Sequence, residues 1–178
     1  MRWIWIDKFV EFTPKTSATA VKNVSLAEEH LHDLYPNFPI VPHSLIVEGM
    51  AQTAGILVGE ARKFSEKVIL AKIGRATFHR LVRPGDTIAF HATIDQLSEQ
   101  GASISGRVTV GQNLVAEIEL MFSHIDQNLA GIEYPEHNFV FTEQFTELLM
   151  TYRLSSSVTL CCCYLLLVTR SLRATSNR

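Results

Sequence analysis

Three prolines spaced three residues apart, followed by an apolar run with a single carboxylate, constrain this chain more than any other segment. Residues 35–52 read YPNFPIVPHSLIVEGMAQ. Proline fixes φ and lacks an amide donor, so the segment that ends at Pro42 is expected to be extended or turning. Small and apolar residues dominate from Ser44 onward, which is typical of a helix buried on nearly every side.

Glu48 is the lone acid in the second turn of this predicted helix. A carboxyl group held away from water there suits proton transfer. A structural role is the alternative, because an anionic side chain near a helix start is favoured by the unpaired backbone amides. Gln52 follows one turn later on the same face. Its amide could hydrogen-bond the carboxyl group or a substrate, or simply satisfy a buried polar neighbour.

Two later segments extend the pattern. Residues 70–86 read LAKIGRATFHRLVRPGD, and residues 114–122 read LVAEIELMF. Together with the spaced prolines, the glutamate six residues after the last proline and the MAQ triplet, they resemble 3-hydroxyacyl-acyl-carrier-protein dehydratases of the FabA/FabZ type. The similarity covers about residues 3–125. It implies an α+β hotdog fold, with a long central helix wrapped by a curved antiparallel sheet, and assembly as dimers or multiples of dimers.

The segment before the first proline departs from the family motif, which normally reads Gly-His-Phe-Pro with the histidine as the base. Counting back from Pro36 places Asp33 at the glycine, Leu34 at the histidine and Tyr35 at the phenylalanine. Leucine cannot accept a proton. The family's acid lies fourteen residues after the histidine, and that spacing leads to Glu48. The resemblance therefore supplies the acid of the reaction but not the usual base.

Another histidine could replace the missing base. His43 stands at the helix entrance, where the family has a glycine whose amide helps to hold the thioester carbonyl. His32 is two residues before Leu34, on the same side of an extended segment. The alternative for both is a surface or loop histidine without a catalytic task, and this alternative is strong. Ser44 is a candidate N-cap, and by resemblance its amide lies beside the carbonyl position. The predicted site comprises two catalytic residues, Glu48 and His43, and three substrate contacts, Ser44, Gln52 and Leu34.

Three functions are compatible with these residues. The first is dehydration of a 3-hydroxyacyl thioester to a trans-2-enoyl thioester, with Glu48 as the acid and a relocated base. The second is a catalytically silent hotdog subunit that binds acyl thioesters or an active partner, which Leu34 favours directly. The third is a hotdog thioesterase, in which Glu48 activates water or attacks the carbonyl.

Dehydration of an acyl thioester implies a partner that carries the acyl group. An acyl group carried on acidic acyl carrier protein, or on coenzyme A, would be steered by basic residues near the site. Four basic residues after the helix are candidates, although they could also form an ordinary solvated strand face: Lys72, Arg75, Arg80 and Arg83. The formal net charge of −2 does not suggest a nucleic-acid-binding surface. No histidine pair has a convincing metal spacing, and no cofactor is implied.

The composition divides the chain of 178 residues into three segments. We expect a hotdog domain at 1–126, a helical extension at 127–154 and a low-complexity tail at 155–178. The tail's apolar run at 158–168 is shorter than the roughly 20 residues that cross a bilayer. The start of the chain lacks the sustained apolar region of a signal peptide, and the three cysteines are consecutive. Both features favour the cytoplasm.

Alternation of apolar and polar residues predicts the other elements of the domain. The long helix is expected at 44–63, and a short helix or loop at 25–33. Strands without intervening helices imply antiparallel pairing. They are expected at 3–12, 18–24, 68–82, 87–97, 102–110 and 114–125.

Overall fold

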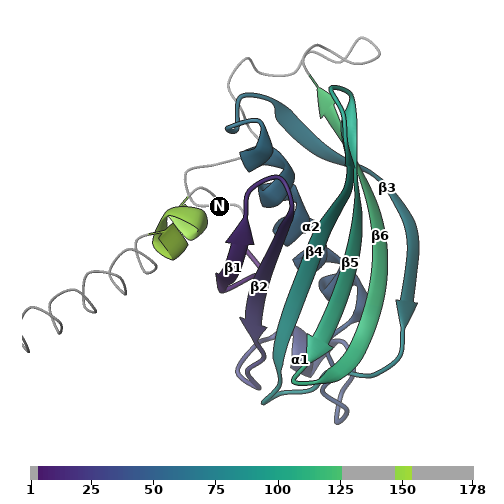
Figure 1. The fold of residues 1–178 in the computed structure, drawn as a ribbon. Coiled ribbons are helices and arrows are strands. Elements are labelled where there is room, and N and C mark those ends of the chain that lie inside the picture. The colour runs from purple at the N-terminus through teal and green to yellow at the C-terminus, as the bar shows by residue number, and fades with distance from the viewer. Residues whose placement is uncertain (1–3, 126–146, 154–178) are drawn as a thin grey trace, which may run out of the picture.

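The computed structural model describes residues 4–125 and 147–153. Within residues 4–125, a curved antiparallel sheet wraps a long helix (Figure 1). The strand order is β1-β2-β4-β5-β6-β3. The α+β hotdog fold expected from the resemblance is therefore confirmed. The elements are β1 (Lys8–Thr13), β2 (Ser17–Asn23), α1 (His30–Asp33), α2 (His43–Ala61), β3 (Lys67–Phe78), β4 (Thr87–Leu97), β5 (Gly101–Val110) and β6 (Asn113–Ile125).

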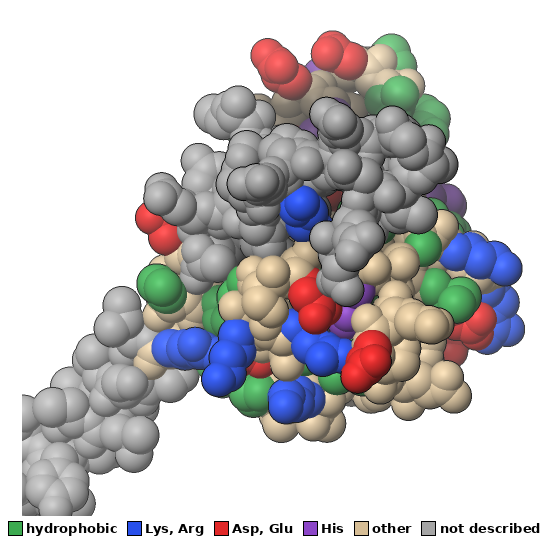
Figure 2. Space-filling model, turned by 90° about the horizontal axis from the view of Figure 1, so that it is seen from above, with side chains coloured by type: hydrophobic (Ala, Val, Ile, Leu, Met, Phe, Trp, Pro, Cys, Tyr) green, Lys and Arg blue, Asp and Glu red, His purple; other side chains and the backbone are tan. Residues whose placement is uncertain are grey.

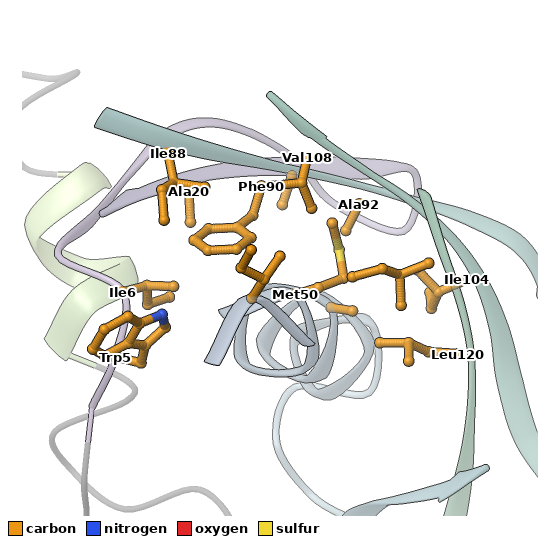
Figure 3. Packing of buried hydrophobic residues seen from close by; sticks show 14 of the residues in the cluster. Trp5, Ile6, Ala20, Met50, Ile88, Phe90, Ala92, Ile104, Val108 and Leu120 are labelled. Carbon is orange, nitrogen blue, oxygen red and sulfur yellow. The ribbon is translucent and has the colours of Figure 1, made fainter. Parts of the chain in front are cut away.

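The core lies between α2 and the concave face of the sheet. Met50 of α2 and Phe90 of β4 belong to one buried cluster there (Figure 3). Alternate residues of β4 face the helix, which accounts for the period-two pattern in the sequence. Gly49 permits a close approach of α2 to β4, because a Cβ atom at this position would lie 2.3 Å from Cζ of Phe90. A small residue beside Glu48 thus brings the helix tightly against the sheet.

The start of the chain differs from the prediction. A strand was expected at 3–12, but β1 begins at Lys8. The backbone amides of Trp5 and Ile6 donate to the side chain of Gln52 in α2. These residues therefore bind the helix instead of extending the sheet. The strand prediction for them was wrong.

The strand predicted at 68–82 also ends early, because β3 stops at Phe78. The amide of His79 still donates to the carbonyl of Val115, at 2.8 Å. Further along, the carbonyl of Val82 accepts from the amide of Val41, at 2.9 Å. Residues 79–82 thus leave the sheet and fix the segment that leads into α2.

The long helix agrees with its prediction to within two residues. It begins after Pro42, whose ψ of 141° is extended, and Lys63 and Phe64 adopt positive φ after its end. The short helix α1 falls inside the segment predicted as a short helix or loop.

Residues 147–153 form a helical turn against the domain. Leu149 is 2% exposed, and Nη2 of Arg153 lies 2.7 Å from Oε1 of Glu60 near the end of α2. The remainder of the predicted extension and the tail, residues 126–146 and 154–178, lie outside the described residues. Within the described part of the chain, no helix is long and apolar enough to cross a membrane.

Candidate active site

Three polar side chains follow one another along α2 at a spacing of four residues. Ser44, Glu48 and Gln52 therefore share one face of the helix. Their burial increases along the helix: Ser44 is exposed, Glu48 is half-buried and Gln52 is 7% exposed. The carboxyl group thus lies between an open end and a closed end of this polar row.

Gln52 holds the carboxyl group of Glu48. Its Nε2 donates to Oε1 of Glu48 at 2.7 Å. Its Oε1 accepts from the amides of Trp5, at 2.8 Å, and Ile6, at 3.4 Å. Two backbone donors fix the oxygen of the side-chain amide, so its nitrogen must face Glu48. The acid is therefore oriented through Gln52 by the N-terminal segment.

Leu34 lies just after α1, in the segment that leads to α2. It is 53% exposed, and Tyr35 and Phe38 beside it are exposed as well. The guanidinium of Arg83 lies 5.1 Å from the ring centre of Phe38. The position of the family's base is therefore an accessible, apolar stretch of surface.

His43 is the first residue of α2, and its ring is exposed. It stacks on Phe78 with ring centres 4.0 Å apart and an angle of 4° between the planes. Five residues separate His43 from Glu48, which places the two side chains about 140° apart around the helix axis. The structure therefore does not bring this predicted base onto the face that carries Glu48.

His32 is also engaged elsewhere, since its Nε2 lies 2.6 Å from the carbonyl oxygen of Leu26. Three further histidines face carboxylates away from α2's polar row. The pairs are His30 with Glu28 at 3.7 Å, His79 with Glu117 at 3.1 Å and His124 with Glu66 at 2.8 Å. His137 lies outside the described residues.

His91 belongs to the opposite face of the sheet, because its neighbours in β4 point toward the helix. Its ring nitrogens lie 3.2 Å from Oγ1 of Thr19 and 3.1 Å from Oγ1 of Thr109. Burial lowers the pKa of His91 below its usual 6.5. The carboxylate of Glu11 opposes this shift and the guanidinium of Arg107 adds to it. His91 is thus a neutral structural histidine near pH 7.

Two of the four basic residues proposed to guide a carrier have different partners. Arg75 pairs with Glu119 across β3 and β6 at 2.8 Å, whereas Arg83 covers Phe38. Figure 2 shows the upper end of the molecule as drawn in Figure 1, where basic and acidic side chains are intermixed. Of the four, Arg83 is the one in contact with the Leu34–Phe38 segment.

Sequence reasoning missed the two amides that orient Gln52 and the ring that stacks on His43. The amides of Trp5 and Ile6 lie in a segment whose alternating pattern resembled a strand. Phe78 was treated only as a strand residue. Among the described residues, no group of three or more His, Cys, Asp or Glu side chains is arranged to hold a metal ion.

Comparisons with known proteins bear on the segment that forms this site. The model of the FabA-like domain matches residues 4–119. A 3-hydroxyacyl-[acyl-carrier-protein] dehydratase FabZ from Rickettsia bellii is 38% identical over 117 residues, which are 65% of this chain and 81% of that protein. A FabZ from Caldanaerobacter subterraneus is 34% identical over 121 residues, or 67% of this chain and 86% of that protein.

Solved structures share the fold at low sequence identity. The dehydratase heterocomplex ApeI:P from Xenorhabdus doucetiae has a TM-score of 0.59 at 14% identity, over 69% of this chain and 84% of that one. The conserved protein PA5202 from Pseudomonas aeruginosa has a TM-score of 0.56 at 15% identity, over 66% of this chain and 87% of that one. These similarities establish a common architecture.

Proposed function

This chain belongs to the FabA/FabZ-type family of hotdog dehydratases, and we propose from that membership that it dehydrates 3-hydroxyacyl thioesters. The product is a trans-2-enoyl thioester, formed in fatty-acid or related lipid biosynthesis. The observation that carries the proposal is the carboxyl group of Glu48, held by Gln52 on the half-open face of α2. This is the family's acid at the family's spacing from the proline motif.

The reaction needs two proton transfers, one to a base and one from an acid. A base removes the proton from the α-carbon, and the electron pair of that C–H bond forms the double bond to the β-carbon. The bond between the β-carbon and its hydroxyl oxygen breaks, and the protonated carboxyl group of Glu48 donates its proton to give water. Proton transfer from the base back to Glu48 restores the starting state.

Residues of α2 other than Glu48, together with Leu34 just after α1, are proposed to bind the thioester or to orient Glu48. The helix starts at His43 and Ser44, where backbone amides lack partners within the helix. Amides at a helix start can stabilise the negative charge that develops on the thioester oxygen. Gln52 contributes by orienting Glu48, and Leu34 is proposed to contact the substrate as an apolar surface.

The base has two candidate sources. Within the chain, His43 is proposed because it stands at the exposed entrance of α2. The other source is a histidine of a different polypeptide. His43→Ala tests the first source, because a base in this position should account for at least a hundredfold in rate.

The relatives with more than 30% identity carry dehydratase names, which favours dehydration over the silent subunit and the thioesterase. The acyl group is proposed to arrive on acyl carrier protein, as the names of those relatives indicate, with coenzyme A as the other possible carrier. A cytoplasmic location is proposed together with this activity.

A dimer or a multiple of dimers is proposed as the assembly. β3 is an edge strand of the sheet, and Leu70 and Ile73 on it are exposed. Edge strands with exposed apolar side chains readily pair with another chain. Light scattering of the purified protein would measure the assembly directly.

Hydration of crotonyl and longer enoyl thioesters, the reverse reaction, tests the activity. Free thiol should be followed in the same samples. Hydration that disappears in Glu48→Gln supports a dehydratase, whereas release of thiol without hydration would identify a thioesterase.

A further inference from the structure

Lys22 lies near the end of β2, and its ammonium group is largely buried. Its side chain is 13% exposed. The Nζ atom donates to the carbonyl of Asn23 at 2.9 Å and to Oε1 of Glu28 at 3.1 Å, and it lies 3.7 Å from Oδ1 of Asp7. Lysine is buried in proteins chiefly where such partners surround its charge. Lys22 therefore contacts both the segment before β1 and the segment after β2.

The first of these segments, residues 5–7, connects Lys22 to the candidate acid. The ammonium group lies 4.8 Å from the ring centre of Trp5, which is within reach of a cation–π interaction. The backbone amide of Trp5 donates to Gln52, which in turn holds Glu48. Figure 3 shows Trp5 beside α2. A shift of the Trp5 ring would therefore displace the backbone that orients Glu48.

Asp7 fixes the other end of the same segment. Its Oδ2 accepts from the backbone amide of Asn23 at 2.7 Å and from Nδ2 of Asn23 at 3.1 Å. The amide of Asp7 donates to the carbonyl of Val21 at 2.8 Å. Residues 5–7 are thus bound to β2 on one side and to Gln52 on the other, so the end of β2 determines where the acceptor of Gln52 finds its donors.

The second segment connects Lys22 to Leu34. Besides Lys22, Oε1 of Glu28 accepts from the amide of Ser25 at 3.0 Å, and Oε2 of Glu28 lies 3.7 Å from Nε2 of His30. His30 is the first residue of α1, and Leu34 directly follows the end of this helix. Glu28 therefore holds the start of α1 against Lys22.

The two segments also touch each other. The rings of Trp5 and His30 meet edge to face, with their centres 5.4 Å apart and an angle of 67° between the planes. Lys22, Glu28, His30 and Trp5 thus form a closed loop of contacts, in which each residue touches the next and the last touches Lys22. No member can shift without disturbing two others.

We propose that Lys22 is a positioning residue of the dehydratase site, which sets the placement of Glu48 relative to the Leu34 segment without touching the substrate. The inference rests on the proposed dehydratase function. An acid works only when it is placed against the reacting bond, and a displacement of about 1 Å can cost about a hundredfold in rate. Lys22 can control this placement because the segments that carry the two sides of the site meet at its ammonium group.

Lys22→Met removes the charge and keeps a flexible apolar stem that can pack against Trp5. Lys22→Arg restores a cation that can pair with the same carboxylates and stack on the same ring. Lys8→Met is the matched control, because Lys8 is exposed on β1 and lies opposite Val21, next to Lys22 in β2. Lys22→Gln replaces Lys22→Met if the latter does not fold, and circular dichroism establishes the fold of each variant.

Nuclear magnetic resonance reports both segments without any need for activity. The carboxamide protons of Gln52, assigned by their disappearance in Gln52→Met, report the segment at residues 5–7. The methyl groups of Leu34, assigned in the same way with Leu34→His, report the segment after α1. In Lys22→Met both sets of resonances should shift, and the Gln52 carboxamide protons should exchange faster with water. Neither set should shift in Lys8→Met, and Lys22→Arg should return both toward their wild-type positions.

Hydration of crotonyl thioester then tests the effect on the reaction, in the wild-type chain and in Leu34→His. Lys22→Met should lower kcat by about tenfold or more, because the acid is misplaced. It should leave KM within about twofold, because Lys22 makes no contact with the substrate. Lys22→Arg should recover most of the lost kcat, and Lys8→Met should change neither constant.

Each other outcome has a defined meaning. Unshifted Gln52 or Leu34 resonances in a folded, uncharged Lys22 variant would overturn the positioning role. The same holds if Lys22→Arg restores nothing, if Lys8→Met has equal effects, or if neither uncharged variant folds, because Lys22 would then be a general structural residue. A raised KM with unchanged kcat would also contradict it. Shifted resonances without hydration by any chain, Leu34→His included, would support the placement of Glu48 by Lys22 and overturn the dehydratase function alone.

Discussion

The side-chain amide of Gln52 donates at 2.7 Å to Oε1 of Glu48, which lies one turn earlier along α2. The other end of the same amide accepts from the backbone of Trp5 and Ile6. The N-terminal segment and the candidate acid are therefore connected through one side chain. Stability and activity should both depend on it.

Gln52→Met is expected to destabilise the fold. The buried amides of Trp5 and Ile6 would lose an acceptor, and a buried polar group without a partner costs about 1–3 kcal/mol. The midpoint of urea unfolding should fall accordingly. Gln96→Met is the matched control, because Gln96 is exposed on β4 and surface changes usually stay within about 0.5 kcal/mol. Equal midpoints for the two variants would contradict the role assigned to Gln52.

Gly49→Ala is expected to destabilise the protein by about 1–3 kcal/mol, the usual cost of overpacking a core. The added methyl group would lie 2.3 Å from Cζ of Phe90, a fully buried ring. Gly106→Ala is the comparison, because its methyl group would meet Sδ of Met50 at 2.6 Å. The flexible thioether can move more easily than the ring. Thermal melts should show the larger loss for Gly49→Ala, and the opposite order would contradict this packing.

The stability of the protein should fall as the pH drops below about 6.5, in part because of His91. Burial lowers the pKa of its imidazole in the folded state, so the unfolded chain takes up the proton first. The contribution of neutral His91 to the free energy of unfolding is complete above pH 6.5. It is lost as the pH falls through the pKa of His91 in the folded state. His91→Gln should flatten this part of a plot of unfolding free energy against pH. An unchanged slope would show that other groups cause the loss.

The sequence predicted the fold well because its strongest signals are local. Prolines at 36, 39 and 42 define where α2 begins, and alternation along residues 87–97 and 114–125 reproduces β4 and β6. The errors occur where tertiary contacts take backbone groups away from the sheet. Trp5 and Ile6 bind Gln52, and Val82 binds Val41 at the helix entrance. Neither contact has a local sequence pattern.

The site was predicted in part. Glu48 and Gln52 were placed on one helical face from their spacing, and the hydrogen bond between them agrees with that placement. His43 was proposed from its distance along the chain, which does not report direction around a helix. Its ring lies on Phe78, from the end of β3. That contact joins residues 35 positions apart, so periodicity within the helix could not reveal it.

The most direct test of the central claim compares the hydration of crotonyl thioester by Leu34→His with that by Leu34→His/Glu48→Gln. If α2 carries a dehydratase acid that lacks only a base, the single variant should gain activity of at least tenfold over wild type. The double variant should lose that gain while its melting temperature stays close to that of the single variant. A folded Leu34→His variant without activity, or one whose activity survives the loss of the Glu48 carboxyl group, would contradict the account.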